Sequence, residues 1–581
     1  MKKFFILLKV IRWLVLALMI VVSLFALAAV IITRHQLVAE LGRAIVLGTF
    51  AAVAAMLFLF IWWICRGYGV RSTVIAFAGF ALLIALFYAE EDFRGWHAWQ
   101  SFKHQSEAKG EKLDFASVVP PPVPDGQNFA LSDVVASSYE YILDKHGHRI
   151  TPSNTNVVNR LAMNIYRNDN WERQPTNSYW AKGTLTDLKA WQAYYRIPNT
   201  NSDSVMTNEF PVALEPQAPA VDVLLALSKF DSTVEELRQA SKLPFSRYPI
   251  NYNSDPICGV LLPHLAGTKR CAQHLALRGE AELELGQSEK ALADIELGFR
   301  VIDSMRQEPF LISHLVRIAE FSIILQPVYE GLARHQWSES ELVELERELA
   351  KFDFLADYQL SMRGERNESI STIDYLRRHR SYNDIGLFDW SINSGEIKLG
   401  NLISETLYAL IPTGWFFLNE ASIGRFHERW FLPMVEPQKH LIHPKIPEQA
   451  DAALSTMHRT PENFIVAILM PALSVAELKF GYGQSAVDMA RVGCALERYR
   501  IAHGEYPTSL TVLSPQFIES VPNDVVGGQP LKYRRTGDGR FVLYSIGWNE
   551  IDDGGKIGLR PSGSPDMRTG DWVWQYETRV P

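Results

Sequence analysis

Residues 277–291 read LRGEAELELGQSEKA, and this stretch decides the fold of the central part of the chain. Gly286 interrupts a helical pattern and is the residue type that best ends one helix and opens a turn. The second helix starts close to Ala291. Gly279 and Ala291 are small, so two helices can approach closely here. The stretch therefore predicts a helical hairpin over about residues 272–302.

The hairpin resembles one helical pair of the tetratricopeptide type. Such repeats bury their faces against neighbouring copies, and the sequence contains no second copy. We therefore expect a lone hairpin within a mainly α-helical domain spanning 127–459. The signatures Ser232–Glu235 and Ser338–Glu341 predict capped helix starts. The acidic run Glu280, Glu282 and Glu284 is interpreted as a solvated face, and His264, His274, His314 and His335 as packing or surface residues.

Composition excludes some classes of protein. The 581 residues are 47% hydrophobic and 21% charged, with a formal net charge of −8, as in an ordinary folded protein. The first 89 residues hold eight Lys and Arg against one acid, Glu40, so the remaining chain is strongly acidic. Nucleic acid is not an expected partner, because phosphate binding depends on clustered Lys and Arg.

Three uncharged apolar stretches begin the chain, at 13–33, 44–65 and 72–89. Their lengths fit a hydrocarbon core about 30 Å thick, so residues 1–89 predict a three-helix membrane anchor in contact with the lipid bilayer. Lys2, Lys3, Lys9 and Arg12 precede the first stretch, which places the N-terminus in the cytoplasm and the large domain in the periplasm or outside the cell. A cytoplasmic large domain is the alternative.

Residues 90–126 are expected to form a juxtamembrane helix and a proline-rich linker that ends at Pro120–Gly126. A further module is predicted at 460–581. Residues 485–503 repeat apolar side chains at helical spacing, and Gly504 can end that helix. Residues 531–535 and 541–545 flank Thr536–Gly539 and predict a β-hairpin.

The order of short motifs in this module resembles the globular domain of type II secretion major pseudopilins. The matching stretches are Ala495–Arg500, His503–Thr508, Val521–Asp524, Gly528–Tyr533, Tyr544–Gly547, Asp553–Gly555 and Asp571–Trp572. The resemblance implies a long helix packed on a small antiparallel sheet. It also implies that the late acidic loop binds calcium.

The residues of that loop suit calcium chemically. Ca²⁺ takes about six to eight oxygen ligands from carboxylates, amides and carbonyls on a loop that can bend. Asn549, Asp552, Asp553 and Asp571 supply side-chain oxygens, so the sequence predicts a Ca²⁺ site at these four residues. The alternative is a solvated acidic turn whose carboxylates accept backbone amide hydrogen bonds.

The body of the chain resembles uncharacterised bacterial membrane proteins through Gly110–Asp114, Pro120–Pro124 and Pro309–Arg317, and this likeness implies no activity. HExxH, Walker-type and GxSxG motifs are absent from the sequence. Arg363–Arg366 is expected to hold a buried ion network. Cys258 and Cys271 are either two free thiols or a disulfide.

The expected fold class is three N-terminal transmembrane helices, then a mainly α-helical extramembrane domain, then a small α+β module. We expect a membrane-anchored, non-enzymatic binding or structural protein of the bacterial inner membrane and envelope. Its partners would be other envelope proteins, including type II secretion or pilus-like machinery. The alternative is an envelope hydrolase with an unrecognised site. Titratable residues clustered in a pocket would favour the hydrolase, and an apolar groove would favour the binding protein.

Overall fold

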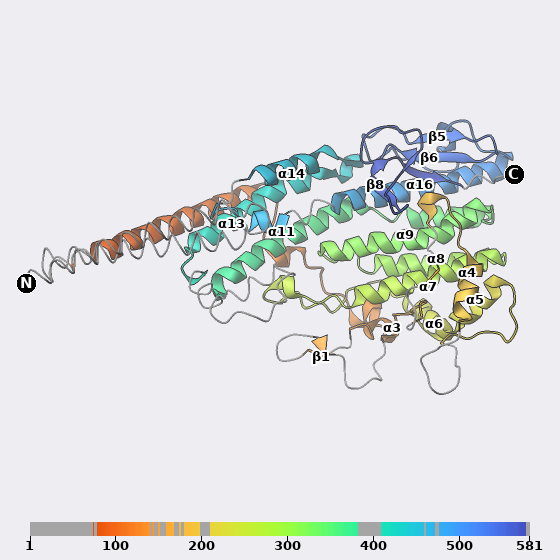
Figure 1. The fold of residues 1–581 in the computed structure, drawn as a ribbon, viewed down its shortest axis with the longest axis horizontal. Helices are drawn as coiled ribbons and strands as arrows, with labels where there is room; N and C mark the ends of the chain where they lie inside the picture. The colour runs from red at the N-terminus through yellow and green to blue at the C-terminus, as the bar shows by residue number, and fades with distance from the viewer. Residues whose placement is uncertain are drawn as a thin grey trace, which may run out of the picture. The chain divides into compact units, whose positions relative to one another are not determined.

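The computed structural model describes residues 74, 78–139, 142–143, 149–150, 159–167, 174–175, 179–197, 209–380, 408–457, 460–470 and 476–576 (Figure 1). The chain forms two compact units, Met1–Phe93 and Arg94–Pro581.

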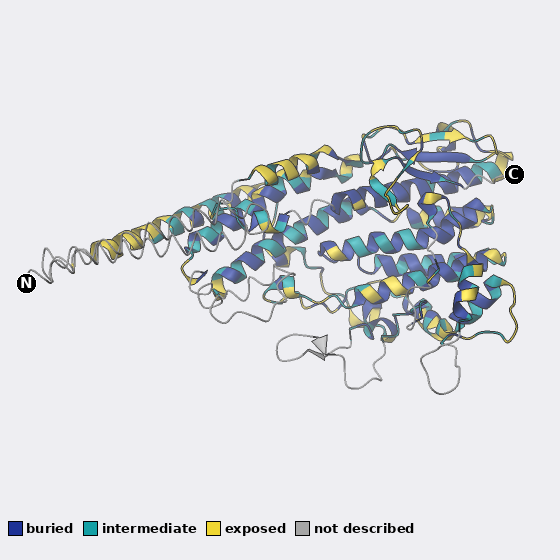
Figure 2. Cartoon of the chain, in the orientation of Figure 1, coloured by how far each residue is buried: buried dark blue, intermediate teal, exposed yellow. Residues whose placement is uncertain are grey.

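The described residues of the first unit are helical at position 74 and over 78–93. Large apolar side chains on this stretch are exposed. Phe80, Leu82, Leu83, Leu86 and Phe87 are 41–66% exposed, and Figure 2 shows this stretch largely in the colour of exposed residues. The described helical part of the first unit therefore exposes apolar side chains to an extent that is unusual for a helix in water.

The predicted fold class, with three N-terminal transmembrane helices, is wrong. Among the described residues, one helix is long and apolar enough to cross a membrane, α9 (Leu311–Ala333), and 67% of its apolar window is buried inside the protein. The structure is mostly helical, with a small sheet part near the C-terminus.

The stretches 13–33 and 44–65 lie outside the described residues, and 72–89 is described only in part. Its described helical part, 78–89, supplies about 18 Å of helix at 1.5 Å per residue before Glu90, Glu91 and Asp92 follow. These acids come too soon for the described part to span a hydrocarbon core. The long helix α9 is also apolar enough to cross a membrane, but its apolar composition reflects burial inside the protein.

The second unit begins with helical residues 94–108 and is mainly helical. Its α-helices are α3 (Asp133–Ala136), α4 (Leu188–Tyr195), α5 (Pro219–Leu227), α6 (Asp231–Ala240), α7 (His264–Glu284), α8 (Ser288–Asp303), α9, α10 (Glu339–Leu349), α11 (Phe354–His379), α13 (Thr413–Phe426), α14 (Lys445–Thr456), α15 (Val466–Leu469) and α16 (Ala476–His503).

Its strands are short and antiparallel. They are β1 (Ile142–Leu143), β2 (Arg149–Ile150), β3 (Val435–Glu436), β4 (Leu441–Ile442), β5 (Lys532–Arg535), β6 (Phe541–Ser545), β7 (Ile557–Leu559), β8 (Pro565–Gly570) and β9 (Trp572–Gln575). The largest described sheet has the order β5-β6-β9. β5 pairs with β6 in the register Lys532↔Tyr544, which confirms the predicted hairpin.

Helix α16 lies between this sheet and the helices α9, α10 and α11 (Figure 1). The sequence predicts an amphipathic helix over 485–503, whereas the helix begins at Ala476 and 20 of its 28 residues are buried. Gly504 follows with φ +82°, as expected of a glycine that ends a helix. The polar positions of the predicted amphipathic face are covered because helices pack on one side of α16 and strands on the other.

Helices α7 and α8 flank Gly286, which has φ +71° at the position where the sequence predicts the turn. A Cβ atom added at Gly279 would lie 3.5 Å from Pro327 Cβ and 3.8 Å from the Ala291 carbonyl oxygen. Gly279 thus lies where α7 meets both α8 and α9. The three helices run side by side (Figure 1).

Of the two predicted capping boxes, one forms. Ser338 Oγ accepts the Glu341 amide at 3.3 Å, and Glu341 Oε2 accepts the Ser338 amide at 2.7 Å. The box predicted at Ser232 is wrong, because Ser232 lies inside α6. A capping box needs an extended residue immediately before the helix. The 3₁₀ turn Ser228–Phe230 leads directly into α6, so the residues before α6 are in a helical turn.

The expected ion network at Arg363–Arg366 is confirmed. Glu111 lies 2.7 Å from Arg363 Nη2 and 2.9 Å from Arg366 Nη1, and Arg366 is fully buried. Asn367 Nδ2 donates to the carbonyl oxygens of Lys112 (3.0 Å) and Asp114 (2.9 Å). Burial opposes the charge on Glu111, but the hydrogen bonds from both arginines outweigh it and lower its pKa. The segment 110–114 is thereby fastened to α11.

The last turn of α16 is held by Glu497, which is 1% exposed. Its carboxylate accepts hydrogen bonds from Arg500 Nη2 at 2.7 Å, Tyr506 Oη at 2.7 Å and His335 Nδ1 at 2.9 Å. Burial disfavours the charged form, but these three partners outweigh it and lower the pKa of Glu497 to about 2. The ionised carboxylate thus joins α16, the following turn and the end of α9.

We predict that Glu497→Gln destabilises the protein by about 2 kcal/mol at neutral pH, because a depressed carboxyl pKa is a stabilising contribution. This contribution is present above the unfolded pKa of about 4.3 and is lost as the pH falls through the folded value. The gap between wild type and variant should therefore close on acidification. Urea unfolding across that pH range measures it, with the exposed Glu519→Gln as control. A gap that does not change with pH would contradict the prediction.

Candidate functional site

A cavity of about 200 Å³ opens between α7, α9 and the segment that leads into α4. Its walls combine aromatic rings, aliphatic side chains and a few polar groups, the usual composition of a small-molecule site. The lining residues are Ile165, Tyr166, Tyr179, Thr186, Trp191, Gln273, Ala276, Leu277, Glu280, Ser322, Ile323 and Gln326.

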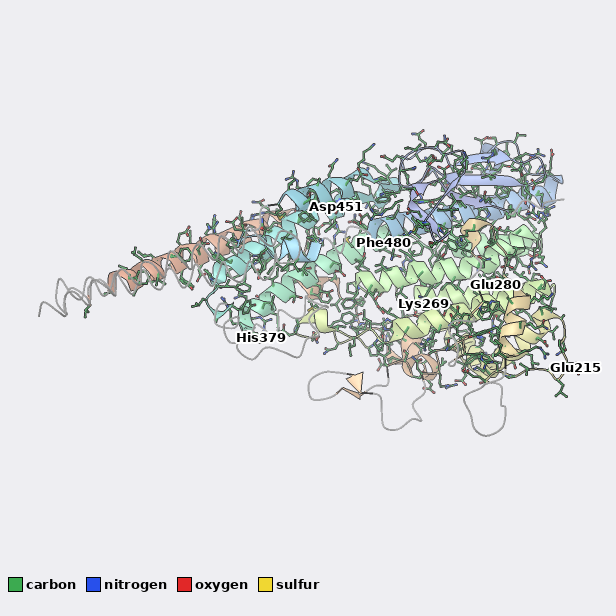
Figure 3. The ribbon with its side chains drawn as sticks, in the orientation of Figure 1. Glu215, Lys269, Glu280, His379, Asp451 and Phe480 are labelled. Atoms are coloured by element: carbon green, nitrogen blue, oxygen red, sulfur yellow. The ribbon has the colours of Figure 1, made fainter. Side chains whose placement is uncertain are left out.

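Helical spacing brings the polar groups of the cavity together. On α7, Gln273, Leu277 and Glu280 are four and three residues apart, so they share one helix face. On α9, Ser322 and Gln326 are four residues apart and share another. Because α7 and α9 pack against each other, the two faces meet at the cavity. Figure 3 labels Glu280 in this part of the molecule, near α4 and α5.

The aromatic wall comes from outside the two long helices. Trp191 lies on α4, and its ring centroid is 5.7 Å from that of Tyr166. The hydroxyl of Tyr179 lies 2.7 Å from that of Tyr482 on α16, and this hydrogen bond holds the Tyr179 side chain in the wall. The rings are thus held in place by the packing of the second unit.

Among the described lining residues, Glu280 is the only acidic or basic side chain, and it is 5% exposed. Burial and the nearby carboxylate of Glu330 raise the pKa of Glu280 well above its usual range, against smaller opposing effects of Thr186 and Arg334. The neutral acid is therefore favoured while the cavity stays dry. A protonated carboxyl both donates and accepts hydrogen bonds.

Glu330 lies behind Glu280 and is 1% exposed. Its Oε1 accepts the Thr186 amide at 2.7 Å and Gln326 Nε2 at 2.9 Å, while Arg334 Nη2 lies 3.4 Å from Oε2. The oxygens of this carboxylate are thus already bonded within the protein. Of the two acids, Glu280 is the one that lines the cavity.

Gln326 contributes an unused acceptor. Its Nε2 donates to Glu330 and to the Thr184 carbonyl oxygen, each at 2.9 Å. Its Oε1 is buried and has no hydrogen-bond partner among the described residues. A buried carbonyl oxygen without a donor is costly, so a ligand that supplies a donor would satisfy it.

The interpretation of the acidic run as a solvated face is wrong for Glu280 and Glu282, which are 5% and 2% exposed. Arg278 pairs with Glu282 at 3.4 Å and with Asp294 at 2.9 Å in a separate ion network, whereas Glu284 is half-exposed beside Arg334. Alternation of Glu with apolar residues does not reveal burial in a helix that is covered on several sides. The sequence did offer one signal for the position of Glu280, because helical spacing places it on the same face of α7 as Gln273 and Leu277.

The histidines pack in the core or near its edge, as expected. His264, His274 and His314 are fully buried. Burial lowers the pKa of His274 to about 3 and that of His314 to about 4, so both are neutral at ordinary pH. His264 Nε2 lies 2.8 Å from Glu308 Oε1, and the His264 ring stacks on the ring of Tyr248. None of these side chains lines the Glu280 cavity.

A larger hollow, of about 360 Å³, lies between α14 and residues 548–550. Its charged lining includes Lys445, paired with Glu550 at 2.8 Å, and the Lys445 side chain is 74% exposed. Charges that are already paired in solvent provide little affinity for a ligand. The Glu280 cavity is the better candidate because its polar groups are buried.

Of the predicted Ca²⁺ ligands, Asn549, Asp552 and Asp553 lie in the loop before β7, and Asp571 lies between β8 and β9. Their side-chain oxygens accept hydrogen bonds from the protein. Asp571 accepts the amides of Asp553 (3.2 Å) and Gly555 (2.6 Å), and Asn549 Nδ2 donates to Asp553 Oδ2 at 3.0 Å. Asp552 lies 3.3 Å from Lys532 Nζ. Within the described residues, no three acidic, histidine or cysteine side chains group as a metal site would require.

Calcium binding at this loop stays a prediction. Calorimetry with CaCl₂ should show binding that disappears when Asp552→Ala and Asp553→Ala are combined, because calcium needs several carboxylate oxygens. Asp566→Ala, in β8 outside the loop, is the control. Equal binding by the double variant and the wild type would exclude this site.

Cys258 and Cys271 are free thiols, so the alternative of a disulfide between them does not apply to this structure. Cys271 is fully buried and Cys258 is partly exposed.

Comparison with known proteins finds no matching family model, no similar curated protein and no similar solved structure. The resemblance of residues 460–581 to pseudopilins therefore stays a prediction. The function has to be inferred from the geometry of the molecule.

Proposed function

We propose that the second unit is a small-molecule-binding module and that the chain acts as a non-enzymatic binding protein. The observation that supports this most is the half-open, mostly apolar cavity with one buried carboxyl group, Glu280, on its wall. A site of this composition suits recognition by shape and a few hydrogen bonds.

A hydrolase is the second candidate, and the neighbouring acids Glu280 and Glu330 favour it. An acid with a raised pKa beside a second carboxylate is the arrangement that many glycosidases use. In that reaction both carboxyl groups must reach the substrate. Glu330 does not line the cavity and is bonded to Thr186 and Gln326, so binding is the better-supported function.

A cavity-filling variant tests the proposal. We expect Ala276→Leu, on the cavity wall, to abolish the binding of fragments that the wild type binds, because the added carbons occupy the space of the ligand. The measurement is ligand-observed NMR with a fragment mixture of alcohols, amides and amines on the full-length protein. Ala452→Leu, exposed on α14, is the matched control, and circular dichroism checks folding. No bound fragment, or fragments bound equally by Ala276→Leu, would overturn the proposal.

We further propose that the chain acts at a membrane surface in the bacterial envelope, with other envelope proteins as partners. The exposed apolar side chains over 78–89 support a lipid-contacting surface, because such a surface is unfavourable in water. The pseudopilin-like order of motifs supports partners in secretion or pilus-like machinery.

We expect Leu83→Lys combined with Phe87→Lys to reduce the fraction of full-length protein that floats with phospholipid vesicles, since charge at these positions opposes contact with acyl chains. Leu214→Lys is the control, because Leu214 is a fully exposed apolar residue outside this stretch. Unchanged flotation of the double variant would exclude lipid contact by residues 83 and 87.

A further inference from the structure

The charge balance of the Glu280 cavity indicates what kind of ligand it takes. Its described lining contains one carboxyl group and no lysine, arginine or histidine. Arg334, the nearest cation that acts on Glu280, contacts Glu284 and Glu330 instead. An anionic ligand would meet the Glu280 and Glu330 pair with no cation on the wall, so anions are disfavoured.

Two hydrogen-bond acceptors belong to residues that line the cavity. Gln326 Oε1 is buried and lacks a donor among the described residues, and Glu280 becomes a pure acceptor when it ionises. The Gln326 amide cannot turn its NH₂ group toward the ligand without losing its bonds to Thr184 and Glu330. A ligand that fills the site must therefore present donors.

The aromatic wall adds a second constraint. The rings of Tyr166 and Trp191 lie within 5.7 Å of each other and border the same cavity as Glu280. Aromatic faces attract cations, and most strongly where water is excluded. They also pack against aliphatic groups. The wall therefore suits a cation that carries an apolar substituent.

We propose that the cavity binds a small organic ammonium ion that has at least one N–H and an apolar substituent. The N–H groups would bond to Gln326 and Glu280, and the substituent would pack on Tyr166, Trp191 and Leu277. This inference rests on the proposed binding function and adds the class of ligand.

The state of Glu280 agrees with such a ligand. The charged groups that act on it are Glu330 of α9 and Arg334, which directly follows α9, and Thr186 bonds to both acids. In the empty cavity the neutral acid avoids placing a second negative charge beside Glu330. A bound ammonium ion would compensate that charge, so Glu280 would ionise and form a charge-assisted hydrogen bond.

Calorimetry on the full-length protein with three probes tests the inference. Cyclohexylammonium chloride has charge, N–H donors and an apolar ring. Cyclohexanol keeps the ring and a donor without the charge, and tetramethylammonium keeps the charge without a donor. We expect cyclohexylammonium to bind roughly tenfold or more tightly than either, because charged hydrogen bonds and ring contacts add.

Glu280→Gln should weaken cyclohexylammonium at least roughly tenfold and leave cyclohexanol nearly unchanged, since only the ammonium ion needs the carboxylate. Glu289→Gln, exposed on α8, is the matched control. Thermal unfolding of each variant checks that it is folded.

Cyclohexanol that binds as tightly as the ammonium ion, or an ammonium affinity that Glu280→Gln leaves intact, would overturn the choice of a cation but not the binding function. Tetramethylammonium that binds equally would overturn the need for N–H. Absence of binding by cyclohexylammonium also overturns the inference. The fragment experiment with Ala276→Leu then decides separately whether the cavity binds small molecules at all.

Discussion

The packing of α16 between a sheet and a helical layer is the constraint on which the second unit depends. A helix covered on both sides has almost no surface on which to place polar side chains. Two of the polar residues that α16 carries, Gln484 and Asp488, are bonded to its neighbours. Gln484 Oε1 accepts the Phe354 amide at 2.8 Å, and Asp488 lies 2.7 Å from His440 Nε2. Because both layers contact α16, the helical and sheet parts form one body.

The positions of Glu280 and its cavity follow from this arrangement. α16 holds α9 from one side, and α7 packs on α9 from another, so Gln326 and Glu280 are carried on helices that cannot move apart easily. Tyr482 of α16 holds Tyr179 in the cavity wall. The binding site is thus built on packed helices, which position side chains more closely than loops do.

Local features of the fold could be predicted from the sequence. Gly286 and Gly504 could be predicted as helix ends because glycine readily adopts a positive φ. The hairpin around Thr536–Gly539 could be predicted because turn residues separate two strand-forming runs. These signals are local, because each depends on the residue's own backbone. The resemblance to pseudopilins implied a long helix beside a small antiparallel sheet, and its functional meaning stays a prediction.

Features that depend on tertiary packing could not be predicted. Hydropathy does not separate a helix buried in protein from one in lipid, and so α9, like the N-terminal stretches, has the composition of a span. The cavity beside Glu280 depends on Tyr166 and Trp191, which lie far away in sequence. Calcium ligation depends on where the oxygens of Asp552 and Asp571 point, and composition alone does not fix their directions.

The attachment of Glu111 to α11 has a mechanical consequence. The helical residues 94–108 come shortly before Glu111. Arg363 and Arg366, one turn apart on α11, both hold the Glu111 carboxylate. The segment 110–114 is therefore a fixed joint and not a flexible connector.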